Sequence, residues 1–177
     1  MALILGIDPG SRVCGYGLIN TAGKKLEYVA SGCIRVAKLE FNERLKVIYD
    51  DLTAIIEKYQ PDEVALEEIF VGRSPVSALK LGHARGVVIV ACRNLELPVF
   101  EYPPNQIKKA LVGKGRADKE QMQHMVMSIL SLQAKPQEDA ADALCVAVCH
   151  VHTQSSLIKI SGVQGSRRRR LQEEIKR

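Results

Sequence analysis

The stretch Ile4-Leu5-Gly6-Ile7-Asp8-Pro9-Gly10-Ser11 decides how the chain folds. Its first four residues are apolar or small, as in a buried β-strand, and Pro9-Gly10 is a turn that must end such a strand. Asp8 therefore stands at the strand tip, where a buried charge is costly unless a cation compensates it. An Asp beside Pro-Gly is equally explained by turn chemistry, so other acids must decide between the two interpretations.

The composition indicates one domain with a basic surplus. The 177 residues are enough for one well-filled core and too few for two ordinary domains. The 25 Lys plus Arg residues against 20 Asp plus Glu are compatible with a polyanionic partner, although many proteins with such a surplus bind none. We expect residues 1–153 to form the domain and residues 154–177, which include the run Arg167–Arg170, to form a basic and flexible C-terminal tail.

We expect a cytoplasmic protein with no membrane partner. No apolar run approaches the length of a membrane span, and residues 1–8 lack a basic leader and a cleavage site. The five cysteines form no C-x-x-C pair and most lie in apolar stretches, which suits reduced thiols. Four potential metal ligands do cluster in the sequence, but their spacing matches none of the usual zinc frameworks; they are Cys145, Cys149, His150 and His152.

The pattern of apolar residues predicts an α/β fold. Three short apolar or alternating runs open the chain with turn signals between them, so we expect three consecutive antiparallel strands. They span residues 2–8, 14–19 and 26–36. Two more strands are expected, at 63–70 and 97–102. Helices are expected where apolar residues recur at threes and fours or where start and stop signals agree. They span 41–59, 74–93, 105–112, 118–132 and 136–153.

One predicted helix, 74–93, carries small residues on a single face. Ala78, Gly82 and Gly86 recur at spacings of four, and each glycine costs a helix about 1 kcal/mol relative to alanine. Close approach of another backbone would compensate this cost. We therefore expect this face to be a helix-packing seam or a dimer seam.

Acidic residues recur at the ends of separate predicted elements. Glu67 or Glu68 closes the fourth strand, and because side chains alternate along a strand, only one of them can face as Asp8 does. Asp139 and Asp142 lie three residues apart in the last helix, and hence on one of its faces. Acids in a first helical turn also complement the helix dipole, which explains Asp139 better than it explains Asp142.

Four carboxylates gathered by one sheet and its last helix would form a site for hard cations. Two charges 4 Å apart repel by on the order of 4 kcal/mol at an effective dielectric of 20, so such a cluster should bind divalent ions or hold protons. Oxygen ligands favour Mg²⁺ or Mn²⁺. Two such ions about 3.5 to 4 Å apart suit phosphodiester hydrolysis.

Five stretches of the sequence resemble those of the RuvC family, the bacterial Holliday junction resolvases, in the same order and at matching spacing. They are Gly6–Ser11, Ala65–Phe70, Ala78–Gly82, Gln123–Val126 and Asp139–Leu144. The resemblance implies an RNase H-like fold, with a mixed central sheet flanked by helices. It also implies a homodimer that cuts two opposed strands of a four-way DNA junction with Mg²⁺ or Mn²⁺, leaving ligatable 5'-phosphate and 3'-hydroxyl ends. The branch-migration proteins RuvA and RuvB are implied partners.

The same resemblance implies roles for individual residues. The catalytic, metal-ligating acids would be Asp8, Glu67, Asp139 and Asp142. By analogy with RNase H-like nucleases, the first of these would bridge both ions. Phe70 would stack on a base near the crossover, although a phenylalanine is more often a core residue. Lys108 and Lys119 would hold phosphates near the cleaved strand. The resemblance gives no role to His83 or to the C-terminal tail.

Two other classes of protein compete with the nuclease. An actin-like or sugar-kinase ATPase also places an Asp-x-Gly turn after its first strand, but it needs a second similar domain, for which this chain has neither an internal repeat nor the length. A non-enzymatic junction- or DNA-binding module would keep the fold and the basic surface. The complete set of acids argues against that module.

Overall fold

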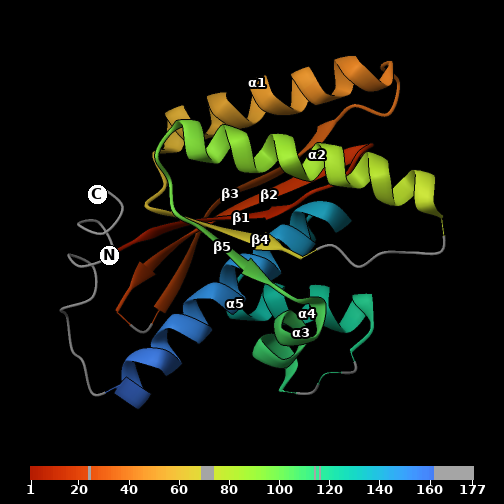
Figure 1. Cartoon of the computed structure of the whole chain (residues 1–177). Helices are drawn as coiled ribbons and strands as arrows, with labels where there is room; N and C mark the ends of the chain where they lie inside the picture. The colour runs from red at the N-terminus through yellow and green to blue at the C-terminus, as the bar shows by residue number, and fades with distance from the viewer. Residues whose placement is uncertain (24, 69–73, 114, 116, 162–177) are drawn as a thin grey trace.

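The structure, a computed structural model, describes residues 1–161 apart from positions 24, 69–73, 114 and 116. At its centre is a five-stranded sheet with helices on both faces (Figure 1). The strands are Leu3–Asp8 (β1), Val13–Ala22 (β2), Lys25–Arg35 (β3), Glu63–Glu67 (β4) and Val99–Tyr102 (β5). The helices are Phe41–Tyr59 (α1), Pro75–Asn94 (α2), Pro104–Val112 (α3), Lys119–Ile129 (α4) and Glu138–Ser161 (α5).

The sheet is mixed, with the strand order β3-β2-β1-β4-β5. β1, β2 and β3 pair antiparallel, which confirms the prediction for the opening of the chain. β4 lies parallel to β1, and β5 lies parallel to β4. The carboxyl ends of β1, β4 and β5 therefore share one edge of the sheet, which is where ligands bind in open α/β sheets.

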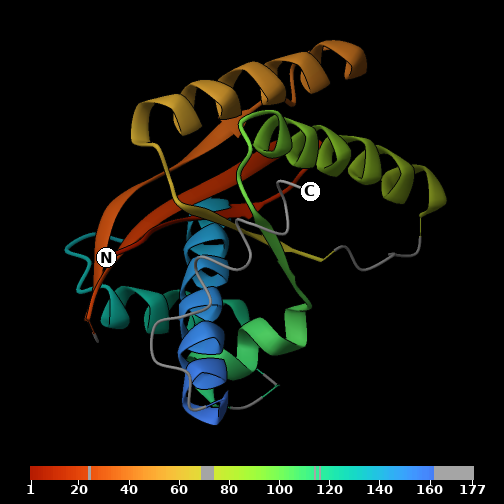
Figure 2. The ribbon, with the colours of Figure 1, turned by 60° about the vertical axis from the view of Figure 1, so that its left-hand side comes forward.

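The helices form two layers, one on each face of the sheet, as both Figure 1 and Figure 2 show. α1 and α2 cover one face, where residues such as Leu5, Leu52 and Val88 form one buried cluster. α3, α4 and α5 cover the other face, where Ile4 and Leu144 belong to a second cluster. Successive residues of β1 thus face opposite layers, and this alternation directs Asp8 toward the layer that contains α5.

Helix α5 lies directly against the sheet because small residues line the contact. A Cβ atom at Gly6 of β1 would stand 2.1 Å from the carbonyl oxygen of Ala143, and one at Gly15 of β2 would stand 2.0 Å from that of Asp139. No side chain fits at either position. Since Gly15 is the register partner of Asp8, this close approach places the start of α5 beside the tip of β1.

Helix α5 ends later than predicted. It continues to Ser161, past Thr153 where the prediction ended it, so the expected boundary at residues 153 and 154 falls inside a helix. The prediction took the change to polar composition as a helix end. Ser and Gln do not stop a helix, and neither Gly nor Pro interrupts this one before Gly162.

Helix α2 carries apolar residues on its exposed side as well as on its buried side. Among the described residues it is the one helix long and apolar enough, by length and composition alone, to cross a membrane, which the sequence analysis did not anticipate. Its buried side packs with α1 and the sheet through residues such as Ala84 and Val88. On the other side, a Cβ at Gly82 or Gly86 would meet no atom within 4 Å. Gly82 and Gly86, two of the three small residues predicted as a seam, therefore have open space above them within the described part of the chain.

Candidate active site

Two of the four predicted acids lie side by side at the ends of parallel strands. Ile7 of β1 pairs with Leu66 of β4, so the next residues, Asp8 and Glu67, are neighbours at the carboxyl edge of the sheet. Both are half-buried, whereas Glu68 is exposed. The alternative left open by the sequence is thereby decided: Glu67 is the residue that faces as Asp8 does.

The other two acids reach the same place from α5. Asp139 lies in the first turn of the helix, where the contact with Gly15 holds its backbone against β2. Asp142 follows three residues later, on the same helical face, and is half-buried. The structure thus gathers four acids from β1, β4 and α5.

Burial and mutual repulsion raise the pKa values of Asp8, Glu67 and Asp142. Burial, and then the charges of Glu67, Asp142 and Asp139, raise the pKa of Asp8 from an ordinary 3.8 to about 7, against an opposing effect of Lys119. Burial and Asp142 likewise raise the pKa of Glu67. Burial is also the largest cause of the raised pKa of Asp142. At neutral pH the site therefore holds a shared proton or needs a cation in its place.

The donor chemistry of the site fits hard divalent ions. All four groups are carboxylates, and a cation would replace the proton that Asp8 otherwise retains near neutral pH. Among the described residues, no three Asp, Glu, His or Cys side chains lie close enough together to ligate one ion. Three or more of these carboxylates would have to come closer together to share an ion.

Both predicted lysines lie beside the acids. Lys108, half-buried in α3, counteracts the rise in the pKa of Glu67. Lys119 begins α4, which has a capping box between Asp118 and Gln121, and its ammonium bonds the carboxylate of Glu138. A cleft of about 480 Å³ lies between α4 and the start of α5. It is lined by Lys119, Glu120, Gln123, Lys135, Pro136, Glu138, Ala141 and Asp142.

Phe70, predicted to stack on a base, lies outside the described residues. The potential zinc ligands near the end of the chain do not form a metal site in the described part. His150 is instead buried between two other partners. Its Nδ1 lies 2.8 Å from the hydroxyl of Tyr102, and its Nε2 lies 2.7 Å from Oε2 of Glu63. No sequence signal connects these three residues, because their spacing depends on how α5 crosses β4 and β5.

The mixed sheet with helices on both faces has an RNase H-like fold, and acids at the carboxyl ends of its strands fit a nuclease of that fold. Residues 4–150 match the sequence model of the family described as Crossover junction endodeoxyribonuclease RuvC. The chain belongs to the RuvC family.

Individual relatives agree with this assignment. The chain is 56% identical to the Crossover junction endodeoxyribonuclease RuvC of Photobacterium profundum, over 96% of this chain and 98% of that protein. It is 57% identical to that of Shewanella sp. (strain W3-18-1), over 92% and 94% of the two chains. Thermus thermophilus RuvC in complex with Holliday junction substrate is 33% identical and superposes with a TM-score of 0.82, over 87% of this chain and 95% of the other.

Proposed function

We propose that four carboxylates ligate two divalent ions and carry out phosphodiester hydrolysis. These carboxylates are Asp8, Glu67, Asp139 and Asp142. By this hydrolysis the chain, as a crossover junction endodeoxyribonuclease of the RuvC family, resolves four-way DNA junctions in recombination and repair. The observation that carries the proposal is electrostatic: Glu67, Asp142 and Asp139, which come from two other elements, all raise the pKa of Asp8. Mg²⁺ is the ion that such an oxygen set favours, and Mn²⁺ has the same preference for oxygen.

The residues of the chain would divide the work around the cleaved bond. When bound, the two ions would supply an activated water and stabilise the leaving oxygen. Asp8, which neighbours Glu67 and whose pKa responds to Asp142 and Asp139, would contribute to both ion sites. Lys108 and Lys119 would neutralise phosphate oxygens beside the acids, and Phe70 would stack on a base near the crossover. The products would be 5'-phosphate and 3'-hydroxyl ends that a ligase can rejoin.

A synthetic four-way junction tests this assignment. We expect paired, symmetric nicks with Mg²⁺ and none with EDTA. Asp8→Asn should lower the cleavage rate by at least about 100-fold, because it removes a ligand, yet leave binding intact or tighter, because it removes a repelling charge. Asp51→Asn makes the same chemical change on the exposed side of α1 and should cut normally. If Asp8→Asn lost binding and cutting equally, the catalytic role would be wrong.

We also infer that the chain acts as a homodimer through the exposed side of α2. Val76, Leu79 and Val90 are 64%, 62% and 51% exposed and recur with the spacing of one helical face. Gly82 and Gly86 lie on that side with open space above them, which permits close approach of a second helix. Symmetric cutting of two opposed strands requires two sites related by a two-fold axis, which a dimer of this kind supplies.

Replacement of an exposed apolar residue tests the dimer. Leu79→Glu should convert the protein to a monomer, measured by light scattering at micromolar concentration, because it places two like charges near the axis. Val29→Glu makes a similar change at a residue of β3 that is 40% exposed, and it should leave the mass of the assembly unchanged. A wild-type protein that scatters as a monomer would contradict the inference.

Family membership supports a proposal for the remaining partners. We propose that the protein works in the cytoplasm with the branch-migration proteins RuvA and RuvB. Free thiols at all five cysteines are compatible with that compartment. Recovery of RuvA with this chain on a four-way junction, and not on linear duplex DNA, would support the partnership.

A further inference from the structure

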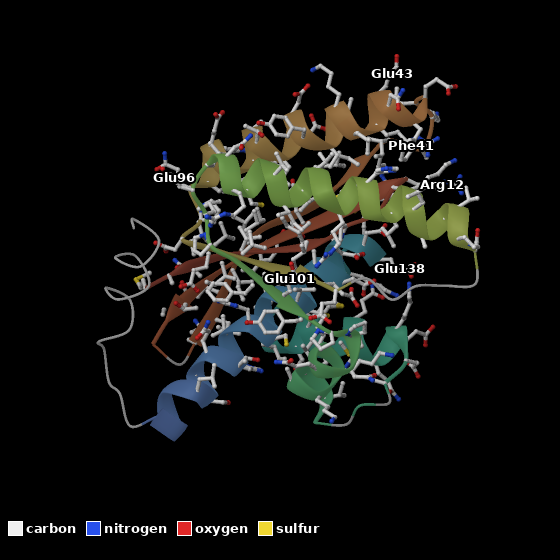
Figure 3. The ribbon with its side chains drawn as sticks, in the orientation of Figure 1. Arg12, Phe41, Glu43, Glu96, Glu101 and Glu138 are labelled. Carbon is white, nitrogen blue, oxygen red and sulfur yellow. The ribbon has the colours of Figure 1, made fainter. Side chains whose placement is uncertain are left out.

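Two residues that lead into Asp139 each bond a cationic side chain, one from β3 and one from α4. Nη2 of Arg35, at the end of β3, donates a hydrogen bond of 2.8 Å to Oε1 of Gln137. The ammonium of Lys119, at the start of α4, bonds Oε1 of Glu138. Figure 3 shows Glu138 at the start of α5, near the end of the sheet where Arg12 precedes β2. The start of α5 therefore lies between a basic residue from the sheet and one from α4.

The position of Arg35 relative to the acids follows from its own strand. Cys33 lies two residues before Arg35, so both side chains face the α5 layer. Burial and then the charge of Asp139 raise the pKa of Cys33, to which Asp8 also contributes, while Arg35 acts in the opposite sense. The pKa of Cys33 thus responds both to the acids and to the guanidinium of Arg35. Arg35 flanks the site from the side of β3.

The charge of Arg35 is not neutralised by the partner that the structure gives it. Gln137 is a neutral amide, and Arg35 has no ion pair within the described part of the chain. The side chain is exposed. A guanidinium has five N–H donors in a planar fork, so one bond to Gln137 leaves donors for a phosphate.

We propose that Arg35 binds a backbone phosphate of the cleaved strand on the β3 side of the acidic site. The strand would then be held on both sides of the scissile bond, by Lys119 from α4 and by Arg35 from β3. Gln137 is a positioning residue that fixes the guanidinium next to α5. The inference rests on the proposed function, since it takes the acids as the place where the strand is cut.

The experiment measures binding of a labelled four-way junction in EDTA over a range of about 50 to 200 mM salt, where phosphate contacts dominate the salt dependence of affinity. Arg35→Gln should raise the Kd roughly three- to tenfold and make the slope of log K against log salt shallower by about one, as expected for one lost phosphate contact. Arg35→Lys should restore the slope. Gln137→Ala should raise the Kd by roughly twofold with the slope unchanged, because the charge remains.

Lys25→Gln is the matched control. Lys25 lies at the other end of β3 and its loss changes the net charge by the same amount, so its Kd should stay within about twofold of the wild type. Cleavage with Mg²⁺ should separate the roles further: Arg35→Gln should raise KM and leave kcat within a few-fold. An unchanged kcat is not expected of a residue that serves only to neutralise the acids.

Equal Kd values and slopes for Arg35→Gln and Lys25→Gln would overturn the inference. So would a shifted pH profile of kcat with unchanged affinity, which would assign Arg35 to neutralising the carboxylates. Both results leave the proposed function standing if the wild type still cuts. Conversely, a wild type that binds junctions and does not cut would defeat the proposed function, while the salt slope would still report on Arg35.

Discussion

At the scale of single residues, Asp8 links the stability of the fold to pH. Its folded pKa is about 7 against an ordinary 3.8, with burial as the largest cause. Between these values an unfolded chain has released the proton and the folded chain retains it. Stability therefore falls as pH rises from about 4 to about 7, by up to roughly 4 kcal/mol for this group.

The fall in stability with rising pH gives a direct prediction for the protein in EDTA. Urea denaturation of the wild type should show a lower free energy of unfolding at pH 8 than at pH 5. Asp8→Asn should reduce that difference, because an amide does not titrate. Part of the difference should persist, since the pKa values of Glu67 and Asp142 are raised as well. A wild type that becomes more stable over this range would contradict the assignment of Asp8 as the dominant group.

The residue scale also shows where sequence reasoning stops. A carboxylate before Pro-Gly predicted a strand tip, and the acids of β4 and α5 predicted a cluster. The cation near Asp139 was not predictable, because Arg35 and Gln137 are 102 residues apart and each is unremarkable alone. The role of Gly15 was equally unpredictable, because it depends on the close approach of the Asp139 carbonyl in the folded chain.

At the scale of elements, local signals predicted helix positions well where they were strong. The periodicity of α1 and the Pro61 beyond it gave the observed bounds, Phe41–Tyr59. The predicted end of α5 at Thr153 is too early, because polar residues alone do not end a helix. Helix α2 has more apolar residues than the core uses. Those on its exposed side, such as Val76 and Leu79, remain uncovered by the described part of the chain.

Helix α5 is tied to the sheet by His150 as well as by small residues. The ring bonds Tyr102 of β5 through one nitrogen and Glu63 of β4 through the other.

His150→Phe would leave both partners without this bond, and we expect the free energy of unfolding, measured by urea denaturation, to fall by about 2–4 kcal/mol. Tyr102→Phe removes only a hydroxyl and should cost about 1–2 kcal/mol. His152→Phe is the control, since His152 is exposed and should change stability by less than about 1 kcal/mol. Equal losses for the two histidine variants would contradict the role of the buried network.

At the scale of the whole molecule, the proposed metal site joins segments that are distant in the sequence. Its ligands come from β1, β4 and α5, which are gathered only in the folded chain. A ligand that binds the folded state alone raises stability by RT ln(1 + [L]/Kd), which is about 2.7 kcal/mol when its concentration is 100 times Kd. For a chain of this size that corresponds to a rise in Tm of roughly 5–10 °C.

We therefore expect Mg²⁺ to raise the Tm of the wild type at pH 8, measured by calorimetry against EDTA at matched ionic strength. The rise should shrink at pH 5.5, because protons then compete with the ion for Asp8, whose pKa is about 7. Asp8→Asn should lose most of the rise at both pH values, and Asp51→Asn should retain it. If Asp8→Asn gained as much stability from Mg²⁺ as the wild type, the ion would be binding elsewhere on the molecule. The four acids would then have to be explained by the protons they share, and the hydrolysis would need a different metal site.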